Sequence, residues 1–81
     1  MDNSQILLTN INRIHTTPMG IDRIKRNLQL ADIDAIDYCT KLISDTKCSI
    51  YMRGKNWYCE IDGVKITVNA KSYTIITAHK I

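Results

Sequence analysis

Aromatic, charged and polar side chains alternate with apolar ones through the middle of the chain, as in a β-sheet with one solvent-exposed face. The exposed set is Tyr51, Arg53, Tyr58, Glu60, Lys65 and Thr67. Rings interleaved with cations suit a single strand of RNA, because rings stack on bases and cations neutralise phosphates. The pattern predicts RNA contacts from this face and the adjoining turn, at Tyr51, Arg53, Lys55, Tyr58 and Lys65. The simpler interpretation is a solvated face on which Glu60 and Lys65 form an exposed cross-strand pair.

Three side chains could supply acid–base chemistry at such a face, namely His79, Glu60 and His15. Cleavage of RNA without a metal needs a base for the 2′-hydroxyl, cations for the phosphorane and an acid for the leaving oxygen. Glu60 or His79, together with Arg53 and Lys65, could fill these roles, and histidine changes protonation near neutral pH. Each histidine also has a simpler interpretation. His79 could be merely exposed, and His15 could satisfy the last carbonyls of a helix.

No pattern in the sequence is typical of a cofactor or metal site. The three glycines form no phosphate-binding loop. Cys39, Cys48 and Cys59 stand nine and eleven residues apart, which is neither a disulfide framework nor a zinc pattern. We expect them to be reduced thiols that pack as small apolar side chains, and we expect no cofactor and no metal.

Composition and charge narrow the class of protein. The 81 residues are 44% apolar and 23% charged, which is usual for one globular domain covering residues 1–81. No apolar run is long enough to span a membrane, and residues 1–5 lack the basic stretch of a signal peptide, so we expect a cytoplasmic protein without membrane contact. Residues 1–46 carry five basic and six acidic residues, whereas residues 47–81 carry six and two. The net charge of +3 therefore comes from the second part.

The first part, residues 1–46, has helical periodicity. A first helix is expected from a cap at Asn3 or Ser4 to about Ile14. Thr17 and Pro18 have the residue types of an N-cap and a first helical position. The second helix would bury Ile21, Ile24 and Leu28. A third helix, with acidic residues before its first turn and an end near residues 44–45, would use Ile33, Ile36, Thr40 and Ile43.

From Cys48 onward the period changes to two, which predicts strands in residues 47–81. Asp62–Gly63 is typical of a type I′ hairpin turn and would pair Ile61 with Val64. Gly54–Lys55 fits a type II′ turn, which keeps the apolar residues of the first three strands on one face.

The last strand, from Tyr73 to about Lys80, has mixed residue types on both faces. An even loop over residues 69–72 would turn Tyr73, Ile75, Thr77 and His79 toward the core. An odd loop or a bulge would bury Thr74, Ile76 and Ala78 instead and expose His79. Helices followed by strands indicate an α+β fold, with two to three N-terminal helices on one face of a four-stranded antiparallel meander.

Several stretches resemble an uncharacterised family of short bacterial and phage proteins, known as a domain of unknown function. They are IHTT at 14–17, GIDRIKRNL at 20–28, GKNWY at 54–58, ITVNA at 66–70 and SYTIITAHK at 72–80. More distantly, helices followed by a meander that ends in IITAH (75–79) are similar to the barnase–colicin–RelE group of small ribonucleases. That resemblance implies helices on one sheet face and RNA cleavage on the other.

These observations favour a small RNA-binding protein, with metal-independent endoribonuclease activity of the toxin type as its extension. The alternative is a non-enzymatic protein-interaction module, such as a phage- or plasmid-borne inhibitor or regulator. Its contact anchors would be Tyr51, Tyr58 and Tyr73. Salt separates the two hypotheses, because phosphate contacts weaken steeply with salt and an apolar interface does not.

Overall fold

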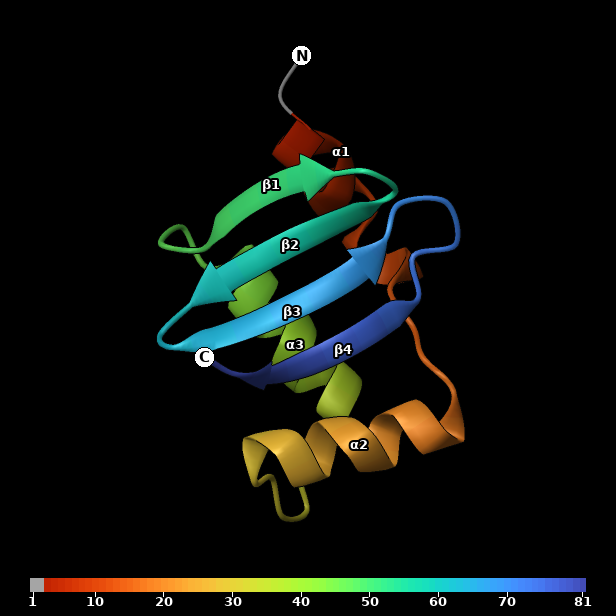
Figure 1. Cartoon of the computed structure of the whole chain (residues 1–81), viewed down its shortest axis with the longest axis vertical. Coiled ribbons are helices and arrows are strands. Elements are labelled where there is room, and N and C mark those ends of the chain that lie inside the picture. The colour runs from red at the N-terminus through yellow and green to blue at the C-terminus, as the bar shows by residue number, and fades with distance from the viewer. Residues whose placement is uncertain (1–2) are drawn as a thin grey trace.

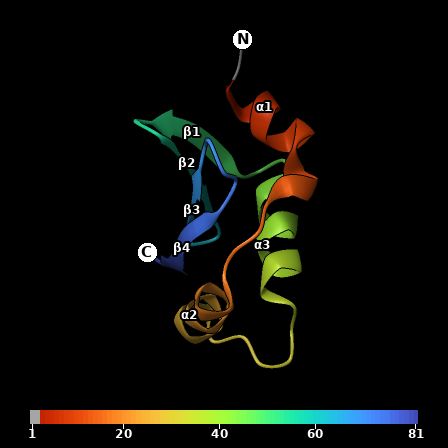
Figure 2. The same ribbon diagram turned by 90° about the vertical axis from the view of Figure 1, so that its right-hand side faces the viewer.

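The computed structural model describes residues 3–81, in which three α-helices and one 3-10 turn precede four antiparallel strands in the order β1-β2-β3-β4 (Figure 1). The elements are α1 (Asn3–Thr9), η1 (Ile11–Arg13), α2 (Pro18–Leu28), α3 (Ala35–Ser44), β1 (Ser49–Arg53), β2 (Asn56–Ile61), β3 (Val64–Asn69) and β4 (Ile75–Lys80). Figure 2 shows α1 and α3 on one side of the sheet and α2 beside the edge of β4, with the other face uncovered. The fold is thus α+β. No helix within residues 3–81 is long and apolar enough to cross a membrane.

The second and third helices begin where local capping chemistry predicts. The Thr17 side chain accepts a hydrogen bond from the N–H of Gly20 at 3.0 Å, and Pro18 occupies the first helical position of α2. Asp34 caps α3 in the same way, accepting from the N–H of Asp37 at 3.0 Å. The predicted start of α2 is therefore confirmed, whereas α3 begins two residues after Ile33, which was predicted to belong to it.

The first helix is shorter than expected. α1 ends at Thr9, and η1 replaces the predicted continuation to Ile14. Asn10 interrupts the helix, because its side-chain amide donates to the carbonyl of Ile6 at 2.8 Å and competes with the backbone for that acceptor. Ser4 lies inside α1, and the residue that would cap the helix lies outside the described residues.

The buried face of α3 also differs from the expected one. Ala35, Cys39 and Ile43 are buried, whereas Ile33 lies before the helix and is 48% exposed. The other two predicted core positions, Ile36 and Thr40, are half-buried. The small side chains of Ala35 and Cys39 are both buried, so the buried stripe starts at the residue after the Asp34 cap.

The first three strands have the predicted register. Ile61 pairs with Val64, and Asp62 and Gly63 between them have φ of 50° and 75°, as a type I′ turn requires. At the other hairpin Arg53 pairs with Asn56 and Gly54 has φ of 63°, in agreement with a type II′ turn. One apolar face therefore continues across β1, β2 and β3.

A β-bulge in β4 combines the two alternatives for the last strand. Ile75 pairs with Val68 and Thr77 pairs with Thr67, which leaves Ile76 as the extra residue. Tyr73 and Ile75 before the bulge are buried, as the even loop predicts. After the bulge the alternation is shifted by one, so Ala78 is buried and His79 is exposed. Neither alternative is right for the whole strand.

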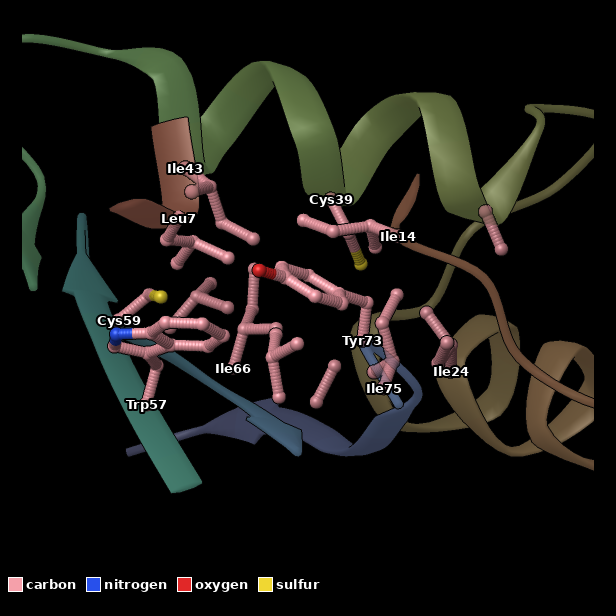
Figure 3. Close-up of a cluster of buried hydrophobic side chains, with 14 of the residues drawn as sticks. Leu7, Ile14, Ile24, Cys39, Ile43, Trp57, Cys59, Ile66, Tyr73 and Ile75 are labelled. Atoms are coloured by element: carbon pink, nitrogen blue, oxygen red, sulfur yellow. The ribbon is translucent and has the colours of Figure 1, made fainter. Parts of the chain in front are cut away.

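Figure 3 shows the core between the sheet and the helices, where Trp57 is 2% exposed, as predicted, and packs against the ring of Tyr73 at 5.4 Å between centroids. Around them gather Leu7, Ile14, Ile24, Cys39, Ile43, Cys59, Ile66 and Ile75. The inner face of the sheet is thereby occupied by packing, and the uncovered face is available for a ligand.

Candidate functional site

Three ionisable side chains form a row across the uncovered face. Glu60 of β2 pairs with Lys65 of β3, and Lys65 pairs with His79 of β4. Adjacent strands are about 4.8 Å apart, so the Cα atoms of Glu60 and His79 are about 10 Å apart, with Lys65 between them. We call Glu60, Lys65 and His79 the polar row. A carboxylate, an ammonium group and an imidazole thus share one line across the strands.

A pair of stacked tyrosines lies beside the polar row. The rings of Tyr51 and Tyr58 have centroids 5.6 Å apart and are inclined by 20°. From the other side, Nζ of Lys65 lies over the Tyr58 ring, 5.2 Å from its centroid. The cation and the two rings therefore form one continuous strip over β1, β2 and β3.

Glu60 is held by a tyrosine and not by the lysine opposite it. The hydroxyl of Tyr51 donates to Oε2 of Glu60 at 2.6 Å, and this hydrogen bond to a carboxylate raises the pKa of Tyr51. Within residues 3–81 the ion pair closer than 4.0 Å is Lys41–Asp37, on α3. Glu60 and Lys65 are cross-strand partners without a direct ion pair, so the ammonium of Lys65 can face a ligand.

Two further cations lie at the hairpin end of the same face. Arg53 is the cross-strand partner of Asn56, and Lys55 is exposed in the turn. Asn56 and Glu60 are four residues apart along β2, so about 13 Å separates their Cα atoms. The face therefore has the polar row at one end, cations at the other and the tyrosines between them.

His15 lies apart from the polar row, next to the beginning of β4. Its backbone bonds to that of Tyr73 and Ile75, and its ring nitrogens lie 2.9 Å from the carbonyl of Arg13 and 3.2 Å from Oγ1 of Thr74. His79 is about 16 Å away along the strand. His15 lies two residues after η1 and its ring contacts the carbonyl of Arg13, the last residue of η1, which fits the simpler, structural interpretation.

Comparison with family models gives the relationship of the chain. Residues 8–79 match the model of a family described as Protein of unknown function (DUF3781). The chain belongs to this family. Comparisons with curated proteins and with solved structures give no match.

In this DUF3781 protein Tyr73 cannot be a contact anchor, which corrects one expectation. It is 7% exposed, has a left-handed φ of 61° and turns its ring into the core beneath the guanidinium of Arg13. Conversely, Thr77 was not among the predicted face residues, yet it pairs with Thr67 on the uncovered face. Thr67 itself was predicted to be exposed there and is only 7% exposed. The bulge that places Thr77 there has no local signal in the sequence.

The thiols of the DUF3781 protein lie on the inner side of the sheet, away from the polar row. Cys39 and Cys59 are buried, and burial raises the pKa of each to about 12. Cys48 is half-buried beside Cys59, and its pKa is also raised, chiefly by burial. No three His, Cys, Asp or Glu side chains within the described range are grouped as metal ligands.

Proposed function

We propose that the uncovered face of the sheet binds single-stranded RNA. The observation that carries this proposal is the strip formed by Lys65, Tyr58 and Tyr51, which combines a cation with rings on a face that no helix covers. Bases stack on aromatic rings irrespective of sequence, and cations beside the rings neutralise the backbone. The excess of basic residues in residues 47–81 is charge of the sign that phosphates require.

Stacking of an RNA base on the Tyr58 ring is more favourable than the contact of the Lys65 ammonium with that ring. An exposed cation–π contact such as Lys65 over Tyr58 is worth about 0.5–1 kcal/mol. Stacking of a base on an aromatic side chain is worth about 1–3 kcal/mol. A base can therefore displace the Lys65 ammonium from the ring, and the freed ammonium then meets the adjacent phosphate. Arg53 and Lys55 would contact phosphates at the hairpin end.

The test is a fluorescence titration with a short single-stranded RNA at two salt concentrations. Arg53→Ala and Lys65→Ala should each weaken binding and make the salt slope shallower by about one unit. Tyr58→Ala should weaken binding by about 1–3 kcal/mol with little change in slope, whereas Tyr58→Phe keeps the ring and should bind nearly as wild type.

Arg23→Ala is the matched control, because Arg23 is exposed on α2 and lies off the sheet face. Feeble, salt-insensitive RNA binding that is equal in wild type and Arg53→Ala would end the RNA hypothesis. The protein-interaction module, with Tyr51 and Tyr58 as its anchors, would then be the better account.

A second function, cleavage of the bound RNA, is favoured by the polar row. In this mechanism the Glu60 carboxylate takes the proton of a 2′-hydroxyl, and the 2′-oxygen attacks the adjacent phosphorus. The bond from phosphorus to the 5′-oxygen breaks as protonated His79 gives that oxygen a proton, while Lys65 neutralises the phosphorane. The products are a 2′,3′-cyclic phosphate and a 5′-hydroxyl, and no redox partner is required. The resemblance of the sequence to the barnase–colicin–RelE group is the analogy that suggested cleavage, and the mechanism itself is argued from the polar row.

Cleavage is tested separately from binding, by following the formation of cyclic phosphate. His79→Ala should lower the rate roughly 100-fold or more and leave affinity nearly unchanged. His15→Gln is the control, since His15 lies at the far end of β4. Equal rates in wild type and His79→Ala would leave RNA binding without catalysis.

A further inference from the structure

The two edge strands of the sheet, β4 and β1, differ in how far other residues occupy their outward backbone groups. Along the outer edge of β4, the carbonyl of Ile75 accepts from Oγ1 of Thr16 and the carbonyl of Ala78 accepts from Nδ2 of Asn27, both at 3.2 Å. The N–H of Ile75 donates to the carbonyl of His15 at 2.8 Å, and the bulge interrupts the strand further. These are devices that prevent strand pairing at an edge.

The edge of β1 has no such cover from the described residues. The two-residue turn makes Arg53–Asn56 a hydrogen-bonded pair, so Tyr51 also bonds to β2, whereas Ile50 and Met52 point their N–H and C=O groups away from it. No hydrogen bond from residues 3–81 outside the hairpin reaches these four groups. β1 contains neither a proline nor a bulge. Its edge is therefore able to accept another strand.

Apolar side chains accompany these open backbone groups. Ile50 and Met52 are half-buried on the inner side of β1. α1 lies behind β1 and leaves Ile6 37% exposed and Leu8 half-buried. A strand added at this edge would lie beside Ile50 and Met52, so both backbone and side chains of β1 favour association.

We propose that a second copy of this chain adds its β1 antiparallel to this edge and forms a twofold dimer with a continuous eight-stranded sheet. The register centred on Tyr51 overlaps all five residues of β1. In it Ile50 of one copy exchanges two hydrogen bonds with Met52 of the other, and the same pair repeats across the twofold axis. This dimer goes beyond RNA binding and does not depend on it.

The charges of Arg53 and Glu60 favour a second copy of this chain as the partner at the β1 edge. In this register Arg53 stands opposite Ser49 of the other copy, and Ser49 is the cross-strand partner of Glu60. Arg53 and the other copy's Glu60 then share one row with only a serine between them, about 10 Å apart at their Cα atoms. Within one chain the same two residues are about 13 Å apart along the strands and lie in different rows. Their complementarity therefore acts between copies, and it occurs twice.

Only five residues of each copy pair, so the interface is small and the affinity is expected to be weak. Dimerisation is therefore measured by sedimentation over about 1 μM to 1 mM protein. Wild type should convert from monomer to dimer in this range. Met52→Pro removes an N–H that only the dimer uses, and proline is tolerated on an edge strand, so the dissociation constant should rise roughly 10- to 100-fold. Retained Trp57 emission would show that the variant is folded.

Charge reversal gives a second measurement that does not rely on proline. Arg53→Glu places like charges in the shared row and should weaken the dimer roughly tenfold. The double variant R53E/E60K restores opposite charges and should return to within about threefold of wild type. A monomer throughout the concentration range, or a dimer that both Arg53→Glu and a folded Met52→Pro leave unchanged, would overturn the proposal. Because the readout is mass, a failure to bind RNA leaves the dimer untouched.

Discussion

At the scale of single residues, geometry more than charge decides which side chains Glu60 and Lys65 contact on the uncovered face. Glu60 and Lys65 are directly opposite, yet the carboxylate accepts from Tyr51 and the ammonium lies over Tyr58. An exposed ion pair is worth less than about 1 kcal/mol, so a short hydrogen bond and a ring contact compete with it easily. The Lys65 ammonium is consequently not held by the carboxylate on the neighbouring strand.

The buried thiols give a prediction about pH at the same scale. Burial raises the pKa of Cys39 and Cys59 from 9.0 to about 12, so the folded protein keeps protons that the unfolded chain releases. The free energy of unfolding should therefore fall as pH rises from about 9 toward 12, and the contribution is fully present below about pH 9. Urea unfolding at about pH 8 and about pH 10.5 measures the difference.

The variant C39A/C59A separates the thiols from the lysines and tyrosines that also titrate in this range. Its free energy of unfolding should fall less between the two pH values than that of wild type. An equal fall in both proteins would show that these thiols do not resist ionisation in the folded state.

At the scale of elements, the Asp62–Gly63 turn fixes the register of β2 and β3, and through it the contact of Glu60 with Lys65. Gly63 has φ of 75°, and no atom lies within 4 Å of the place where a Cβ would stand. The penalty for a larger residue is therefore conformational. Gly63→Val should lower the free energy of unfolding by about 1–3 kcal/mol, measured by urea denaturation.

Asparagine provides the control at this turn, because it adopts a left-handed conformation readily. Gly63→Asn should be within about 0.5–1 kcal/mol of wild type. If valine were tolerated as well as asparagine, the turn would not be what holds this register.

α2 depends on a close approach that only glycine permits. A Cβ at Gly20 would collide with Oγ1 of Thr16, the atom that donates to the carbonyl of Ile75. The first turn of α2 is therefore tied to β4 through the same threonine that covers the edge of the sheet. Thr16, just before α2, thus also occupies a backbone carbonyl on the edge of β4, the strand that carries His79.

At the scale of the whole molecule, Trp57 connects the sheet to the helical layer. It is 2% exposed, and its Nε1 is buried without an acceptor among the described residues. Trp57→Ala should cost about 3–5 kcal/mol, a large part of the roughly 5–15 kcal/mol that stabilises a small domain. Thermal or urea unfolding followed by circular dichroism measures the loss.

Trp57→Phe tests the cause of this loss. It keeps a ring against Tyr73 and removes the buried N–H, whose missing hydrogen bond costs about 1–3 kcal/mol. It should therefore be much milder than Trp57→Ala. Melting of Trp57→Ala close to that of wild type would contradict the placement of this side chain at the centre of the core.

The sequence by itself determined the parts that local chemistry controls. Thr17–Pro18 set the start of α2, and Asp62–Gly63 and Gly54–Lys55 set two turns, because each depends on the preferences of a few adjacent residues. Period-two alternation placed Trp57 inside and Tyr58 outside. Most of the candidate face followed from these signals.

Only the tertiary structure decided the rest, since it depended on contacts between distant residues. The outward position of His79 needed a bulge at Ile76. The bulge lets both Ile75 and Ala78 be buried in the core and leaves one residue unpaired. Likewise the buried face of α3 depended on how the helix packs into the core. The separation of His15 from His79 depended on the pairing of His15 with Thr74, just before β4. Packing made these choices among alternatives that local sequence leaves nearly equal in energy.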